Sequence, residues 1–158
     1  MMSKAIFFSG CGTAYLTNNS VKRNLELYPE TLPALRFLAR RGYLLVLVTS
    51  EFQEYKLLQA VLKDKSLALL HWNGREEDLD CFLEENTINL KESYFVTDSR
   101  FLQEALYQGG WQIILVLTGK GVDTLEKLGS SQLEKITDIC KDIYAAAISI
   151  VLNSKLER

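Results

Sequence analysis

A short turn after the first apolar segment of the chain gathers the side chains best suited to chemistry. Residues 4–8 are mostly apolar, and the turn after them consists of Ser9, Gly10, Cys11, Gly12 and Thr13. A serine hydroxyl becomes a nucleophile when a base removes its proton, and a cysteine thiol when its pKa is lowered. Backbone N–H groups in a turn of small residues can also form an anion site. The turn could therefore supply a nucleophile, an anion site or both.

The only histidine of the chain, His71, is the natural candidate for a base beside this turn. It falls at the end of a predicted strand, so it could lie near Ser9 and accept its proton. A lone histidine at a strand end more often has a structural role. Cys11 also has a second interpretation, as a small buried hydrophobic side chain rather than a reactive thiol.

Short apolar runs alternate with longer segments of helical period, which is typical of an α/β protein with helices on both faces of a parallel sheet. Several runs lack polar alternation, as expected for strands buried on both sides. The predicted strands are residues 4–8, 43–49, 67–71, 94–97 and 112–117, with a short edge strand at 136–140. The predicted helices are residues 29–41, 52–63, 76–85, 101–108, 122–128 and 142–153, the last docking Ile143, Ala147, Ile150 and Val151 on the body.

The ends of these strands indicate where a ligand would bind. In open α/β sheets, ligands bind outside the carboxyl ends of the strands. The turns after Phe8, Thr49 and Thr97 are expected to converge there, with the polar segment 18–24 as an exposed loop beside them. Asp98 follows one of these strands. It could hold a cation, cap the next helix together with Ser99, or bond to backbone amides of the first turn.

Composition limits the class of protein. A chain of 158 residues fits one domain, residues 1–158, and its 47% hydrophobic and 24% charged residues are typical of a soluble globular protein. A net charge of −2 argues against a nucleic-acid binder. The longest apolar run, residues 143–152, is too short for a membrane span. Three widely spaced cysteines indicate neither a zinc knuckle nor a disulfide framework, and they favour a reducing cytoplasm.

Several segments resemble, in order and spacing, the motifs of haloacid-dehalogenase (HAD) phosphatases. The Ser9–Thr13 turn is similar to the first motif, an apolar strand followed by Asp-x-Asp-Gly-Thr, and residues 45–49 resemble the second motif. Residues 88–99 resemble the fourth motif. Residues 115–121 and 26–30 are similar to segments of the histidinol-phosphatase and heptose-bisphosphate-phosphatase branch. The resemblance implies a Rossmannoid three-layer sandwich with a mainly parallel sheet, and no insertion is long enough to build a separate cap domain.

The departures from that family concern its chemistry. In HAD phosphatases the first aspartate attacks phosphorus, the second is the acid/base, other carboxylates help to hold Mg²⁺, and a threonine or serine and a lysine bind phosphate. Here Ser9 and Cys11 stand at the two aspartate positions, and Leu102 stands where a later carboxylate is expected. Asp98 remains as a weak candidate for binding Mg²⁺, and Arg75 could substitute for the lysine. Loss of acid/base help alone costs a rate factor of about 10²–10⁴.

The resemblance therefore implies a degenerate HAD relative that is catalytically inactive and binds a phosphorylated small molecule or a protein partner. The alternative is a weak phosphohydrolase acting on a sugar phosphate through Ser9 or Cys11, with His71 or Asp98. A third possibility is a structural subunit that buries residues 143–151 or Trp72 against a partner. No cofactor is required, and the oligomeric state stays open. The expected phosphate-binding residues are Ser9, Gly10, Cys11, Gly12, Thr13, Thr49, Ser50, Arg75 and Lys120.

Overall fold

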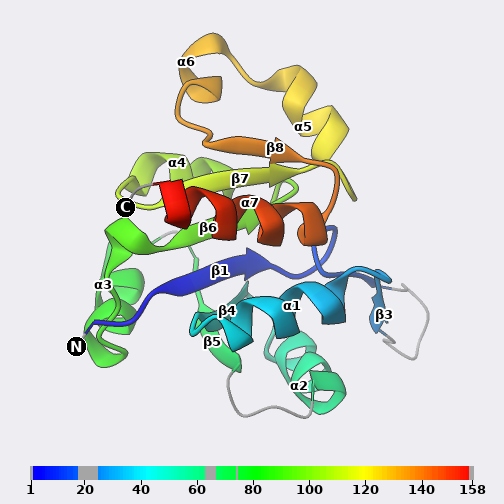
Figure 1. Cartoon of the computed structure of the whole chain (residues 1–158), viewed down its shortest axis with the longest axis vertical. Coiled ribbons are helices and arrows are strands. Elements are labelled where there is room, and N and C mark those ends of the chain that lie inside the picture. Colours follow the sequence, from blue (N-terminus) through cyan, green and yellow to red (C-terminus); the bar gives the residue numbers. More distant parts are fainter. Residues whose placement is uncertain (1, 18–24, 63–66, 74, 157–158) are drawn as a thin grey trace.

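A six-stranded parallel sheet forms the centre of the molecule in the computed structural model, which describes residues 2–17, 25–62, 67–73 and 75–156 (Figure 1). The predicted loop at 18–24 lies outside these residues. The strand order is β5-β4-β1-β6-β7-β8, and every neighbouring pair is parallel. The strands are β1 (Ala5–Ser9), β4 (Leu44–Thr49), β5 (Leu67–His71), β6 (Tyr94–Thr97), β7 (Gln112–Val116) and β8 (Asp138–Cys140). The predicted strands and the α/β class are confirmed.

Helices cover both faces of the sheet, as the alternating pattern predicts. The helices are α1 (Thr31–Arg40), α2 (Phe52–Leu62), α3 (Glu76–Glu85), α4 (Leu102–Gln108), α5 (Gly121–Lys127), α6 (Ser130–Leu133) and α7 (Ile143–Leu156), with a 3-10 turn η1 (Leu90–Glu92). One buried cluster joins α1, α2 and α7 to one face of the sheet, and a second joins α3 and α4 to the other. Figure 1 shows α1 and α7 lying together on the near face.

The two faces are packed with different side chains. The face under α1, α2 and α7 is mainly aliphatic, whereas the face under α3 and α4 holds a group of aromatic rings. Trp72 belongs to this group: it is 1% exposed, and its ring stacks on Phe101 at 5.9 Å. Trp72 is therefore a core aromatic, and its interpretation as a surface that is buried against a partner is wrong.

The last helix, α7, docks on the sheet as its sequence predicts. Ile143, Ala147, Ile150 and Val151 are all buried, so the face of α7 that was considered for a partner is used inside the molecule. The opposite face leaves Tyr144, Ile148 and Leu152 exposed. Among the helices of the described residues, none has the length and apolar character needed to cross a membrane.

Two short features escaped the sequence analysis. A two-stranded antiparallel hairpin pairs β2 (Tyr15–Thr17) with β3 (Leu25–Leu27), and α6 precedes β8. Each element has only three or four residues, which is too few to show a period in the sequence. Helix α4 begins at Leu102, and Phe101 takes the N-cap position with a left-handed φ of 62°. The helix cap predicted for Asp98 or Ser99 therefore falls on Phe101 instead.

Candidate functional site at the carboxyl ends of the strands

Three hydroxyl-bearing residues end the three central strands. Ser9 closes β1, Thr49 closes β4 and Thr97 closes β6, and all three are almost completely buried. Ser9 is in register with Val48 of β4, and Phe8 with Val96 of β6. The register brings the ends of these strands together, as the sequence predicts. In Figure 1 the strand arrows point toward this edge, where β3 also lies.

The Ser9 hydroxyl lies inside a small group of other hydroxyls. Its Oγ is 2.7 Å from Thr13 Oγ1 and 2.9 Å from Thr97 Oγ1. Thr97 Oγ1 donates to the backbone carbonyl of Arg100 at 2.7 Å, and the amide of Asp98 donates to Thr13 Oγ1 at 3.0 Å. All four contacts join atoms of β1, β6 and the turns that follow them. The group links these turns but contains no strong base.

The direction of each bond follows from counting protons, because each hydroxyl has one proton to give. A carbonyl only accepts, so the proton of Thr97 belongs to Arg100, and Ser9 must donate to Thr97. Thr13 can give its one proton to Ser9 Oγ at 2.7 Å or to Asp98 Oδ1 at 3.4 Å. In either case the Ser9 proton goes to a hydroxyl and not directly to a base.

Asp98 joins two loops through its carboxylate. It is 2% exposed, and its Oδ2 accepts a bond from the backbone N–H of Lys120 at 2.9 Å. A Cβ on Gly12 or on Gly119 would meet the same carboxylate oxygen, and both glycines have positive φ. The loops after β1 and β7 thus enclose Asp98 through glycine backbone. The expected bond of Asp98 to a backbone amide is seen in the loop after β7, where Lys120 donates to it.

No cluster of three or more His, Cys, Asp or Glu side chains able to hold a metal ion occurs in the described residues. Asp98 is the predicted weak ligand for Mg²⁺, and Mg²⁺ prefers several oxygen ligands in near-octahedral geometry. The groups beside its carboxylate are the Thr13 hydroxyl and glycine backbone. These residues fit a hydrogen-bonded contact between two loops better than a magnesium site.

The first turn uses much of its own backbone internally. Gly12 N–H donates to the Tyr15 carbonyl at 2.7 Å, and Thr13 N–H donates to the Gly10 carbonyl at 3.1 Å. The expectation that these two amides face an anion is therefore wrong, because the turn is closed by its own carbonyls. Cys11 is half-buried and packs beside the aliphatic core.

The end of β4 carries a charged group that the sequence analysis did not identify. Thr49 Oγ1 donates to Glu54 Oε2 at 2.9 Å and accepts from the Glu51 amide at 3.0 Å. Glu54 is 4% exposed, and its Oε2 is 4.0 Å from Nη1 of Arg100, which follows β6. Thr49 was expected to bind phosphate, but its proton is given to the chain's own carboxylate.

Tyr15 is the second residue that was missed. Its side chain is fully buried, and its phenol oxygen is the one buried side-chain N or O atom without a hydrogen-bond partner among the described residues. A Cβ on Gly10 would meet this oxygen. Burial, and next the charge of Glu54, raise the pKa of Tyr15 well above its ordinary value. The phenol is therefore a neutral donor held close to the site.

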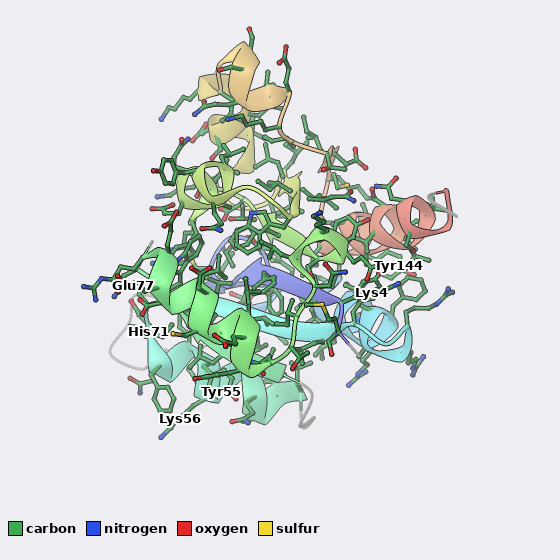
Figure 2. All side chains as sticks on the ribbon, turned by 90° about the vertical axis from the view of Figure 1, so that its left-hand side faces the viewer. Lys4, Tyr55, Lys56, His71, Glu77 and Tyr144 are labelled. Atoms are coloured by element: carbon green, nitrogen blue, oxygen red, sulfur yellow. The ribbon has the colours of Figure 1, made fainter. Side chains whose placement is uncertain are left out.

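The remaining predicted residues lie around this centre rather than in it. His71 Nε2 donates to the carbonyl of Ser50 at 3.0 Å, and it lies at the surface on the flank that also carries Glu77 (Figure 2). Arg75 is exposed at the start of α3, after β5, two strands away from β1. Lys120 contributes its backbone N–H to Asp98 while its side chain is exposed.

Comparison with known proteins supports the fold. No protein-family model matches the chain, and no curated protein matches its sequence. Among solved structures, D,D-heptose 1,7-bisphosphate phosphatase from B. bronchiseptica is similar with a TM-score of 0.74 and 19% identity, over 95% of this chain and 99% of that one. The enzyme from Burkholderia thailandensis has a TM-score of 0.67 and 18% identity, over 94% and 99% of the two chains.

A second type of enzyme has a similar structure. The cobalt-bound deoxy-D-mannose-octulosonate 8-phosphate phosphatase of Haemophilus influenzae gives a TM-score of 0.72 at 8% identity, over 97% of this chain and 86% of that one. The likeness at such low identity concerns the fold. The chain has the α/β fold of HAD-family phosphatases, as the motif resemblance predicts.

Proposed function

We propose that this protein is a HAD-fold binding protein that does not hydrolyse phosphate esters and whose ligand is a phosphorylated small molecule. The observation that carries the proposal is the bonding of Ser9. Its hydroxyl occupies the position of the family's nucleophile, yet its neighbours are the hydroxyls of Thr13 and Thr97. A serine without a base beside it is a weak nucleophile.

The rest of the strand-end site supports the same proposal. Asp98 is engaged with the Lys120 amide, and His71 with the carbonyl of Ser50. Neither has a direct hydrogen bond to the Ser9 hydroxyl among the described residues. The motif resemblance places phosphate at this edge of the sheet, so ligand binding is the activity that can persist without the chemistry.

The experiment that tests this proposal is an assay of phosphate release from sugar phosphates and p-nitrophenyl phosphate with Mg²⁺. The wild-type protein and the Ser9→Ala variant are compared at equal concentration. We expect no release in the wild type above that of the variant. Turnover that Ser9→Ala abolishes would contradict the proposal and favour the alternative, a weak phosphohydrolase that acts through Ser9. A Cys11→Ala variant tests the same alternative for the thiol.

A protein partner is the second candidate, and the exposed side of α7 favours it. Tyr144, Ile148 and Leu152 recur every four residues and form an apolar stripe on this helix. Such a stripe can pair with the same stripe of a second copy of the chain. Sedimentation velocity of the wild type and Ile148→Glu tests this candidate. A dimer that the variant dissociates would support it, and a monomer at all concentrations would reject it.

We infer a cytoplasmic setting for this function. Cys81 and Cys140 form no disulfide, and disulfides are typical of oxidising compartments. A fluorescent fusion seen outside the cytoplasm would contradict this inference.

A further inference from the structure

Two donors from separate parts of the chain contact the Glu54 carboxylate, and a third donor lies near the same strand end. Thr49 lies at the end of β4, Arg100 follows β6, and Tyr15 begins β2. Thr49 donates to Glu54 at 2.9 Å, and the Arg100 guanidinium forms an ion pair with it at 4.0 Å. The Tyr15 phenol oxygen lies against Gly10, and the paired residues Ser9 and Val48 directly precede Gly10 and Thr49. The phenol is therefore placed beside the end of β4, and the charge of Glu54 contributes to its raised pKa.

Glu54 satisfies these donors only in part. Its contact with Arg100 is at the outer limit of an ion pair, and the Tyr15 hydroxyl has no partner among the described residues although it is fully buried. A buried donor without an acceptor is destabilising, and native proteins contain few of them. An acceptor with more oxygens than the one that the chain provides could therefore satisfy these donors more fully.

We propose that Thr49, Tyr15 and Arg100 form an oxyanion site that Glu54 keeps closed, and that the phosphate group of a small ligand enters by displacing Glu54. This inference rests on the proposed function, because it names the place where the phosphate binds. A tetrahedral phosphate presents three acceptor oxygens and carries more charge than a carboxylate. A guanidinium and two hydroxyls are donors that suit such a group.

The location of these residues allows phosphate to replace the Glu54 carboxylate. The side chain of Arg100 is 39% exposed, so it can reach a ligand that arrives from solvent. Glu54 is in the first turn of α2, on a flexible side chain that can leave the site without moving the sheet. The apparent affinity for phosphate is then lowered by the fraction of molecules in which Glu54 is displaced. Neutralising Glu54 removes its charge from competition with the ligand.

The experiment is isothermal titration of the full chain with inorganic phosphate at neutral pH. Glu54→Gln keeps the size of the side chain and removes its charge. We expect it to bind phosphate roughly tenfold more tightly than the wild type. Glu85→Gln is the matched control: it makes the same change of charge at an exposed position at the end of α3, and its affinity should equal that of the wild type. Adding Arg100→Gln to Glu54→Gln should abolish the gain.

Three outcomes would overturn the inference: equal affinity in Glu54→Gln and the wild type, an equal gain in Glu85→Gln, or a gain that survives Arg100→Gln. Circular dichroism and thermal melting check that the variants are folded. If Glu54→Gln does not fold, Glu54→Asp withdraws the carboxylate from Thr49 by one methylene. It should then bind phosphate more tightly than the wild type, and unchanged affinity would again overturn the inference. Failure of the proposed function is a separate result, since it is seen as Ser9-dependent turnover.

Discussion

The two halves of the strand-end site satisfy their polar groups in different ways. The half between β1 and β6 contains the hydroxyls of Ser9, Thr13 and Thr97, each of which has a hydroxyl or carbonyl partner. It also contains the Asp98 carboxylate, which accepts from the Lys120 amide. The half at the end of β4 contains a buried charge, Glu54, and near Gly10 the phenol of Tyr15, which has no hydrogen-bond partner among the described residues. We call these the hydroxyl half and the charged half.

The difference separates the part of the site that stabilises the fold from the part whose hydrogen bonds a ligand could still replace. Every proton of the hydroxyl half is already used inside the chain, so a ligand would have to break bonds there without offering better ones. In the charged half, an acceptor with more oxygens could gain bonds that Glu54 leaves unmade. The hydroxyl half is therefore expected to be rigid and structural, and the charged half to be the place where binding occurs.

The largest expected effect comes from a substitution that disrupts the contact between the first turn and Asp98. Gly12 has φ of 90°, and a Cβ added there would meet the Asp98 carboxylate. Gly12→Ala should lower the free energy of unfolding by about 4 kcal/mol, from left-handed strain plus overpacking. Gly42→Ala is the control, because Gly42 has φ of 87° with nothing near its added Cβ. It should cost only about 1 kcal/mol.

Urea unfolding of the two glycine variants makes the measurement. Their difference isolates the contact with Asp98 from the backbone strain that both variants share. Equal losses in Gly12→Ala and Gly42→Ala would show that the loops around Asp98 are loose, and the description of the hydroxyl half as rigid would fail.

Removing the carboxylate itself is the next test of that half. Asp98→Ala leaves the Lys120 amide without its acceptor and opens a space between Gly12 and Gly119. We expect a loss of about 3 kcal/mol in the free energy of unfolding, since a buried donor and the packing around it are both affected. Asp98→Asn keeps an acceptor oxygen and the shape of the side chain, so its loss should be roughly half as large. Identical losses would indicate that charge, not hydrogen bonding, fixes the loops.

The sequence predicted the fold better than the site because the two depend on different information. Buried parallel strands are continuous apolar runs, such as residues 44–48, and the helices between them have a regular period. These signals are local. The convergence of Ser9, Thr49 and Asp98 at one edge followed from the parallel order of the strands and needed no side-chain detail.

The partners within the site depend on packing, which leaves no local signal. Phe52 and Glu54 belong to the same turn of α2, yet Phe52 is 54% exposed and Glu54 is buried, the reverse of what their polarity suggests. Tyr15 gave no signal either, because its strand has only three residues. The glycine at position 10 was the one available clue, since a larger side chain there would meet the Tyr15 hydroxyl.

A pair of hydroxyl deletions compares the two halves directly. Thr49→Val leaves the Glu54 carboxylate and the Glu51 amide without their shared partner, and should cost about 2 kcal/mol. Ser9→Ala leaves Thr13 free to donate to Asp98 and Thr97 still bonded to Arg100, so it should cost less than about 1 kcal/mol. Chemical denaturation measures both. A larger loss for Ser9→Ala would reverse the assignment of protons in the hydroxyl half.

The smallest expected effect at neutral pH concerns the unpartnered phenol of the charged half. Tyr15→Phe removes a buried hydroxyl that has no acceptor in the described part of the chain, so the free energy of unfolding should stay the same or rise by up to about 1 kcal/mol. Deleting a buried polar atom that has a partner usually lowers the free energy of unfolding instead. A loss of more than about 1 kcal/mol would mean that the hydroxyl has a partner in the folded protein.

The same variant gives a second, independent result at high pH. Burial first, and then Glu54, raise the pKa of Tyr15 above its ordinary value of 10.0. The unfolded chain therefore loses this proton above pH 10 while the folded chain keeps it, and wild-type stability falls as the pH rises. The slope from this group approaches about 1.4 kcal/mol per pH unit. Tyr15→Phe lacks this contribution, so the difference in unfolding free energy between the variant and the wild type should widen between pH 10 and 11. A difference that stays constant over this range would place the phenol in contact with water and remove it from the proposed oxyanion site.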